Sequence, residues 1–245
     1  MDYRKEWINR RLKHVKTPEE IKRKLTRFLN GQSSKILLKE WINLEPIVAM
    51  NSEGTKAKYE PSIKKHWLEV CSMVTMPGYW IEMGVREGRS VGWMLEKFPD
   101  QELHGFDSWE GLPEEWDIGA NVQYKKGDMN VPMPEFPDNI KLYKGWFRDT
   151  LPKWKKKHTG PIALLHVDSD LYSSCRETLT ILNDQIVPGT IITFDELCNF
   201  RLTRKLENWY KHEWRALSEW LVQYHRVVKP ITRNYAYQGA CVVIE

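Results

Sequence analysis

The first part of the chain shows apolar residues at helical spacing. They recur every three or four positions from Trp7 to Val15 and again from Ile21 to Leu29, which is typical of amphipathic helices. Thr17-Pro18-Glu19-Glu20, between the two groups, is a helix-start signal with proline at the first helical position. The pattern predicts two basic helices within residues 2–30 and a further short helix over Ile36–Ile47.

From residue 63 onward, short apolar runs alternate with helical patterns. We expect a helix from Ile63 to Val74, and residues 79–98 read as a strand, a tight glycine turn and a helix. Further elements are expected as strands at Leu103–Phe106, Ile140–Tyr143, Pro161–Leu165 and Gly189–Phe194, and as a helix at Ser173–Asn183. Such alternation predicts an α/β fold with a parallel, doubly wound sheet, whose ligands bind at the carboxyl ends of the strands.

The last part of the chain predicts a helix and two closing strands. The helix spans about Leu206–Val222, and the strands are Val227–Pro230 and Ala240–Ile244. Residues 234–239 form the turn between the strands, which predicts a C-terminal antiparallel hairpin.

Composition favours one main domain with a basic extension. The chain has 245 residues, and 41% of them are hydrophobic, which is enough for a sizeable core. Residues 1–40 carry a net charge of +7, from 12 Lys or Arg and 5 Asp or Glu, and the rest carries −3. The basic helices could contact an acidic partner, nucleic acid or a membrane surface, but a solvated polar face is the simpler interpretation. We divide the chain into a basic helical extension, residues 1–62, and an α/β domain, residues 63–245.

Cysteine spacing and hydropathy favour a reducing, aqueous compartment. The 4 cysteines show no CxxC spacing, which argues against a zinc ribbon. The sequence starts MDYRKEW without an apolar segment behind it, and no run of about 18 apolar residues occurs. We expect a cytoplasmic protein without a membrane span.

The stretch His166–Tyr172 carries the most informative chemistry. Asp168 and Asp170 follow one expected strand, and Asp195 and Glu196 follow the next. Adjacent strands lie about 4.8 Å apart, so carboxylates at their ends come within joint reach of one metal ion. The alternative is that these acids are solvated loop residues or helix caps.

The turn after the first expected strand suits a cationic ligand. Gly84 and Gly88 are spaced as GxxxG, unlike the GxGxxG loop that binds a pyrophosphate. The carboxylate of Glu82, two residues before Gly84, would repel a phosphate and suit an ammonium group. The two glycines also fit a purely steric role.

The tips of the next two strands carry further candidate ligand-binding residues. Asp107 lies about twenty residues past the glycine turn, where an acid can accept hydrogen bonds from ribose hydroxyls; a turn or cap role is the alternative. Trp146 can stack on adenine or fill the core. Residues 114–139, rich in Pro, Asp, Asn and Gly, predict a long connection that covers the site.

Four motifs together resemble a known family. They are Glu82-x-Gly84-x-x-x-Gly88, GFDSWEGLP over residues 105–113, KGWFxDTLP over residues 144–152, and DxDLYxS over residues 168–174. The set is similar to the macrocin O-methyltransferase family of class I S-adenosylmethionine-dependent enzymes, over approximately residues 78–245. The first motif is generic to class I methyltransferases, whereas the last two are specific to this family.

The resemblance implies a Rossmann-like, seven-stranded, mostly parallel sheet with helices on both faces. It also implies Mg²⁺-dependent O-methylation of a sugar hydroxyl on a glycan, nucleotide-sugar or glycosylated natural product. It places Asp168, Asp195 and Glu196 at the metal ligands and Asp170 at the general base. The family usually has Asp or Asn where this chain has Glu196, whose longer side chain could bind the metal through water. The expected S-adenosylmethionine contacts are Glu82, Gly84, Val85, Gly88, Ser90, Asp107, Ser108, Gly145, Trp146 and Asp168.

The chemistry of methyl transfer fits these residues. The protein must align the acceptor oxygen with the methyl carbon and remove the hydroxyl proton. Oxygen ligands suit Mg²⁺, which lowers the pKa of a chelated sugar diol, so that Asp170 can take the proton. We also predict that the helix with Trp209, Trp214 and Trp220 lies over the acceptor site, with one indole facing the cleft to stack on a sugar. Core packing of these rings is the alternative.

Two other functions compete with this one. A nucleic-acid methyltransferase would fit the basic helices, but Asp-Ser-Asp-Leu at residues 168–171 differs from the Asn/Asp-Pro-Pro-aromatic box of amino-methylating enzymes, and clustered acids repel phosphates. A non-catalytic S-adenosylmethionine-binding protein would keep the fold without turnover. We therefore expect a small-molecule or glycan acceptor and no nucleic acid as partner, and a homo-oligomer is an open question.

Overall fold

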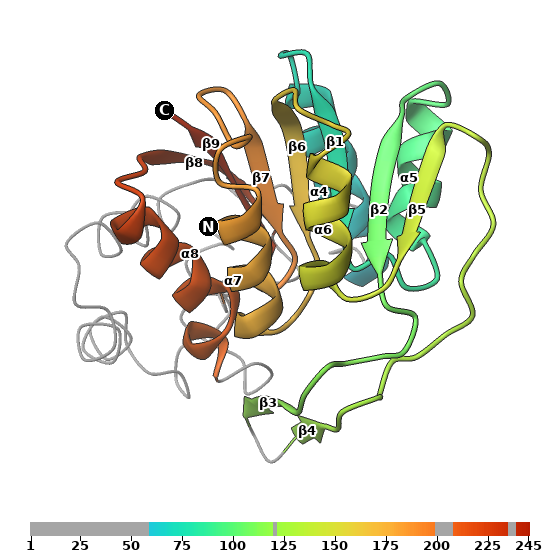
Figure 1. Ribbon diagram of the computed structural model, residues 1–245, viewed down its shortest axis with the longest axis vertical. Helices are drawn as coiled ribbons and strands as arrows, with labels where there is room; N and C mark the ends of the chain where they lie inside the picture. Colours follow the sequence, from blue (N-terminus) through green and yellow to red (C-terminus); the bar gives the residue numbers. More distant parts are fainter. Residues whose placement is uncertain (1–58, 120–121, 199–207, 235–238) are drawn as a thin grey trace, which may run out of the picture.

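The computed structural model describes residues 59–119, 122–198, 208–234 and 239–245 (Figure 1). The helices expected within residues 2–30 and over Ile36–Ile47 lie outside the described residues, as does nearly all of the predicted 1–62 extension. Within the described ranges, no helix combines the length and the apolar character that crossing a membrane requires.

Seven strands form one sheet in the order β5-β2-β1-β6-β7-β9-β8. The parallel strands are β5 (Ile140–Lys144), β2 (Leu103–Asp107), β1 (Tyr79–Met83), β6 (Ile162–Val167) and β7 (Ile191–Phe194). The antiparallel strands β9 (Ala240–Ile244) and β8 (Val228–Arg233) complete the sheet beside β7. The predicted Rossmann-like, mostly parallel sheet with a C-terminal antiparallel pair is confirmed.

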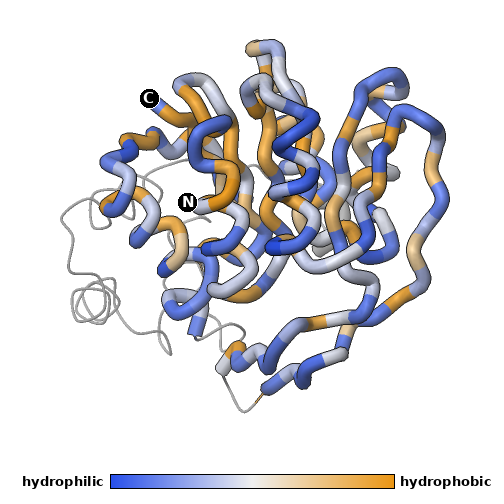
Figure 2. Tube along the Cα trace, in the orientation of Figure 1, coloured by the Kyte–Doolittle hydropathy of each residue, from blue (hydrophilic) through white to orange (hydrophobic). Residues whose placement is uncertain are grey.

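Helices cover both faces of this sheet. Figure 1 shows α4 (Tyr59–Met73) and α5 (Arg89–Lys97) on one face, and α6 (Phe147–Lys155), α7 (Tyr172–Ile181) and α8 (Glu213–Gln223) on the other. Central strands are therefore buried on both sides and read as continuous apolar runs, as β6 does with all 6 of its residues buried. Figure 2 shows the apolar residues gathered in these strands.

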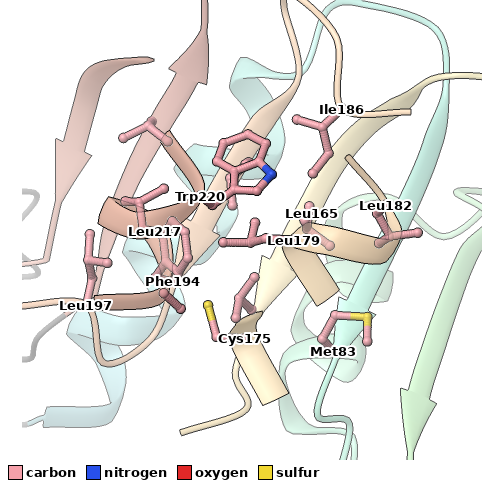
Figure 3. Close-up of a cluster of buried hydrophobic side chains, with 14 of the residues drawn as sticks. Met83, Leu165, Cys175, Leu179, Leu182, Ile186, Phe194, Leu197, Leu217 and Trp220 are labelled. Carbon is pink, nitrogen blue, oxygen red and sulfur yellow. The ribbon is translucent and has the colours of Figure 1, made fainter. Parts of the chain in front are cut away.

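Successive residues of a strand enter two different cores. Leu164 packs in the core under α4 and α5, whereas Leu165 packs in the core under α7 and α8. Consecutive side chains of a strand point to opposite faces, which explains the division. Figure 3 shows the second core, where Leu165, Leu179, Phe194 and Trp220 lie together.

The predicted helix with three tryptophans differs from the structure in extent and in role. Its described part consists of the 3-10 turn η1 (Trp209–Lys211) and α8, separated at His212. Trp209, Trp214 and Trp220 are 4%, 1% and 0% exposed and belong to the hydrophobic core. The prediction that one indole faces the cleft is wrong, because these large rings are buried in the core instead.

Three elements, β3, β4 and α6, were not predicted from the pattern. β3 (Trp116–Gly119) and β4 (Val122–Tyr124) form a small antiparallel hairpin inside the 114–139 connection. α6 contains Pro152, and the helix-breaking signal of this proline hides the helix in the sequence.

Candidate active site

A cavity of about 1000 Å³ opens beside the carboxyl ends of β1, β2, β6 and β7. This volume lies at the upper end for small-molecule sites, which leaves room for a cofactor together with an acceptor. The predicted site residues that line it are Gly84, Val85, Ser90, Asp107, Ser108, Trp146, Asp168, Asp170, Asp195 and Glu196. The other predicted residues, Glu82, Gly88 and Gly145, do not line it.

Gly84 joins the turn after β1 to the loop after β6. Its φ is +94°, and a Cβ at this position would lie 1.8 Å from the carbonyl oxygen of Asp168. Only glycine permits both this backbone conformation and this close approach. On the other side, the Gly84 amide donates a hydrogen bond of 2.8 Å to the carbonyl of Phe106 in β2.

Glu82 and Gly88 lie behind the cavity wall. The Glu82 side chain is fully buried, accepts a hydrogen bond from the Ser90 hydroxyl, and lies 3.7 Å from Nδ1 of His166. Ser90 and His166 both line the cavity, so Glu82 supports two lining residues from beneath. Gly88 has a steric function, since a Cβ there would lie 2.3 Å from the ring of Phe136. Direct contact of Glu82 with a cationic ligand stays a prediction.

Asp107 shapes the turn after β2 and also lines the cavity. Its Oδ2 accepts a hydrogen bond from the Arg86 amide at 2.8 Å, and its Oδ1 accepts one from the Trp109 amide at 2.7 Å. The indole Nε1 of Trp109 donates to the Arg86 carbonyl at 2.9 Å and closes the arrangement. Each carboxylate oxygen can accept more than one hydrogen bond, so the turn role and a ribose contact are compatible.

Asp168, Asp195 and Glu196 meet at the ends of β6 and β7. One carboxylate oxygen of each lies within 4.8 Å of those of the other two. The strands set this spacing, because the Asp168 amide donates to the Met83 carbonyl at 2.9 Å and the Asp195 amide donates to the Val167 carbonyl at 3.1 Å. A set of oxygen donors alone fits a hard cation such as Mg²⁺.

The electrostatics of this group also fit a cation. Burial and the nearby carboxylates of Asp195 and Asp170 raise the pKa of Asp168 well above its ordinary value. Burial and the same two neighbours raise the pKa of Glu196 well above its ordinary value. A bound cation would offset both the burial and the repulsion between these like charges.

Asp170 lines the same cavity two residues beyond Asp168. Its φ of +59° lies in the left-handed region, which aspartate tolerates better than most residues. Burial and the charge of Asp195 raise the pKa of Asp170 to about 7, although the positive charge of Arg86 opposes the rise. A pKa near neutrality suits a general base.

Helix α4 supplies part of the wall, which the sequence did not indicate. Ile63, His66 and Trp67 line the cavity. Nε2 of His66 lies 2.7 Å from Oγ1 of Thr232, and burial together with the charge of His166 lowers the pKa of His66 to about 3. The periodicity of this helix is that of any amphipathic helix, so no local signal marked these residues.

The β3–β4 hairpin supplies an apolar wall of the cavity. This agrees with the predicted role of the 114–139 connection, which was to cover the site. The apolar residues of this connection that line the cavity are Trp116, Ile118, Val122, Tyr124 and Met129. The rings of Trp116 and Tyr124 stack with centroids 5.2 Å apart. Asp117 fastens the hairpin to the segment before α8: its Oδ2 accepts a hydrogen bond from Nδ2 of Asn208 at 2.7 Å, and its carbonyl lies 3.0 Å from Nε2 of His212.

Residues 62–223 match the model of the macrocin-O-methyltransferase (TylF) family, which confirms the resemblance seen in the four motifs. A 29% identical relative is the 8-demethyl-8-(2,3-dimethoxy-alpha-L-rhamnosyl)-tetracenomycin-C 4'-O-methyltransferase of Streptomyces olivaceus. A 28% identical relative is the demethyldecarbamoylnovobiocin O-methyltransferase of Streptomyces niveus. Each alignment covers 49% of this chain and 53% of the relative. The match thus spans about half the length of these curated relatives.

Solved methyltransferase structures share the fold. The calicheamicin methyltransferase CalS11 is 21% identical with a TM-score of 0.62, over 95% of this chain and 96% of that one. The O-methyltransferase NovP is 18% identical with a TM-score of 0.56, over 86% of this chain and 97% of that one. At these identities the similarity establishes the architecture.

Proposed function

Because this chain belongs to the macrocin O-methyltransferase family, we propose that it transfers a methyl group from S-adenosylmethionine to a sugar hydroxyl of a glycosylated small molecule, with Mg²⁺ at the site. The observation that carries the proposal is the meeting of Asp168, Asp195 and Glu196 within 4.8 Å, in the cavity that Asp170 also lines. The S. olivaceus relative acts, by its name, on a rhamnosyl-bearing compound, which favours a glycoside as the acceptor.

The turn after β1 and the tip of β2 are the proposed cofactor end of the cavity. Gly84 and Val85 line it, so a ligand can approach the main chain closely there. Asp107 is positioned to accept hydrogen bonds from the ribose hydroxyls, and Trp146 lines the cavity with a ring that can stack on adenine.

The acids at the ends of β6 and β7 are the proposed metal end. Asp168, Asp195 and Glu196 would hold Mg²⁺, which when bound lowers the pKa of a coordinated sugar hydroxyl and orients it. An oxygen of Glu196 meets the same distance limit as those of the two aspartates, which supports direct binding by Glu196.

Asp170 is the proposed general base. The acceptor oxygen forms its bond to the methyl carbon as the carbon–sulfur bond breaks, and Asp170 receives the hydroxyl proton. Asp170 lines the cavity beside the proposed metal ligands, and its pKa of about 7 allows it to accept a proton at neutral pH. A nucleic-acid substrate fits this cavity less well, because the clustered acids would repel phosphate groups.

The experiment is an acceptor screen. The protein is incubated with S-adenosylmethionine and a panel of rhamnosides and other glycosides, with Mg²⁺ or with EDTA, and the methylated product and S-adenosylhomocysteine are measured by mass spectrometry. The proposal expects methylation of at least one glycoside, lost with EDTA and in Asp170→Asn. Cofactor binding without turnover on any acceptor would favour the non-catalytic alternative, and methylation of an oligonucleotide would favour a nucleic-acid enzyme.

A further inference from the structure

Glu213 connects α8 to the acidic loops. It is the first residue of α8 and is 0% exposed. Its Oε2 atom accepts a hydrogen bond from the Glu196 amide at 3.2 Å. The backbone amide of Ser169 is also close enough to favour the ionised carboxylate and thus to lower its pKa.

These two amides belong to the two loops that carry the proposed metal ligands. Ser169 stands between Asp168 and Asp170, and Glu196 is one of the three acids that meet within 4.8 Å. A single side chain that accepts a hydrogen bond from one loop and interacts favourably with the amide of the other therefore constrains the distance between them.

Helix α8 holds Glu213 in place. On its inner side, Trp214 is buried in the core. On its outer side, Glu219 accepts hydrogen bonds from Nε of Arg215 at 2.8 Å and from the hydroxyl of Tyr172, the first residue of α7, at 2.6 Å. The carboxylate of Glu213 thus projects from a helix that is fixed to both the sheet and α7.

A carboxylate at this place is costly. Burial and the charges of Asp170 and Asp195 raise the pKa of Glu213 well above its ordinary value. An apolar side chain of similar volume would avoid this cost, but it would deprive the Glu196 amide of its acceptor. The buried carboxylate of Glu213 is explained if the gain in free energy from fixing the loops exceeds the cost of burying another acid.

We propose that Glu213 is a positioning residue, which sets the spacing of the metal-binding carboxylates by holding the backbone at Ser169 and Glu196. The inference rests on the proposed function, because the spacing matters for a bound metal. It requires no contact between Glu213 and the metal, since Glu213 is neither one of the three acids that meet within 4.8 Å nor part of the cavity lining.

The test compares Glu213→Leu, which removes both acceptor oxygens at similar volume, with Glu213→Gln, which keeps one. Mg²⁺ binding is measured by titration calorimetry with S-adenosylhomocysteine present. Hydrogen exchange of the Ser169 and Glu196 amides is measured without metal. Glu213→Leu should weaken Mg²⁺ binding roughly 10- to 100-fold and speed exchange at both amides, with S-adenosylhomocysteine affinity unchanged. Glu213→Gln should stay close to the wild type in all three measurements.

Gln223→Leu is the control, because it changes an exposed polar residue at the far end of the same helix, and it should change none of the three measurements. If Glu213→Leu does not fold, Glu213→Asp replaces it: the shorter side chain keeps the charge, retracts from the amides and should also weaken Mg²⁺ binding. A folded variant with wild-type Mg²⁺ affinity, or with unchanged exchange at both amides, overturns the proposal. If the wild type binds no Mg²⁺, the proposed function fails, whereas the exchange data still decide whether Glu213 holds the loops.

Discussion

The indole ring of Trp67 stacks on the imidazole ring of His166, with centroids 4.4 Å apart and 27° between the ring planes. Trp67 belongs to α4, and His166 stands near the end of β6, two residues before Asp168. The indole Nε1 of Trp67 also donates a hydrogen bond of 2.9 Å to the carbonyl of Ser90. Helix α4, which precedes the sheet in sequence, is therefore part of the proposed cofactor site.

The first prediction concerns this stack. Trp67→Leu should weaken S-adenosylhomocysteine binding about 2- to 10-fold, because an aromatic pair contributes about 0.5–1.5 kcal/mol beyond burial and its loss frees His166. Titration calorimetry measures the effect. The control is Trp154→Leu, on α6 and in the other core, which should lower stability but not affinity. Unchanged affinity in a folded Trp67→Leu protein would show that α4 has no part in cofactor binding.

The second prediction concerns Asp107. Asp107→Ala should weaken S-adenosylmethionine binding by about 1.5–3 kcal/mol, the range for hydrogen bonds to a charged group. Both the ribose contact and the turn at Arg86 and Trp109 depend on this carboxylate. Asp184→Ala is a suitable control, since Asp184 accepts a hydrogen bond from Nζ of Lys155 and does not line the cavity. Equal affinities for the wild type and Asp107→Ala would mean that the cofactor binds elsewhere.

The third prediction follows from the burial of the tryptophans. Trp220→Ala should lower the free energy of unfolding by about 3–5 kcal/mol, because it leaves a cavity in the core and removes the hydrogen bond from Nε1 to Oδ1 of Asn183. Val222→Ala, on the same helix and 54% exposed, should change stability by no more than about 0.5 kcal/mol. Urea denaturation measures both. An unchanged free energy of unfolding in Trp220→Ala would contradict the place of this ring in the core.

The fourth prediction concerns pH. Because the pKa of His66 falls from 6.5 in the unfolded chain to about 3 in the folded one, the unfolded chain binds the extra proton between these values. Stability therefore falls as the pH drops below 6.5, by up to about 1.4 kcal/mol per pH unit from this residue. His66→Gln should lose less stability than the wild type between pH 7 and pH 5 in urea denaturation. Parallel curves for the two proteins would show that His66 does not titrate as described.

The alternation of apolar runs and helical patterns was enough to predict the sheet. Strands buried on both faces, such as Ile162–Val167, stand out as apolar runs in the sequence. The hairpin of Trp116–Gly119 and Val122–Tyr124 does not, because its short strands depend on docking to Asn208 and His212 rather than on a pattern of their own.

The same distinction applies to the site. The meeting of Asp168, Asp195 and Glu196 was predictable, because the carboxyl ends of neighbouring parallel strands share one edge of the sheet. The position of Glu213 beside these acids was not predictable, because Glu213 belongs to a helix and not to a strand end. Its contact with Glu196 depends on the break before α8 at His212, which no local pattern marks. The tryptophan spacing was ambiguous, since a helix packed in a core shows the same periodicity as one that lines a cleft.

The central claim is that Asp168 binds the metal while Asp170 takes the proton, and turnover against Mg²⁺ concentration tests it most directly. The measurement compares the wild type, Asp168→Asn and Asp170→Asn, using a glycoside from the acceptor screen. Asp168→Asn should require more Mg²⁺ and recover part of its activity in excess metal, because a neutral amide oxygen is a poorer ligand. Asp170→Asn should keep the wild-type Mg²⁺ dependence and lose about 10²–10⁴-fold in turnover, as expected for a general base. A shifted Mg²⁺ dependence in Asp170→Asn, together with an unshifted one in Asp168→Asn, would contradict the assignment.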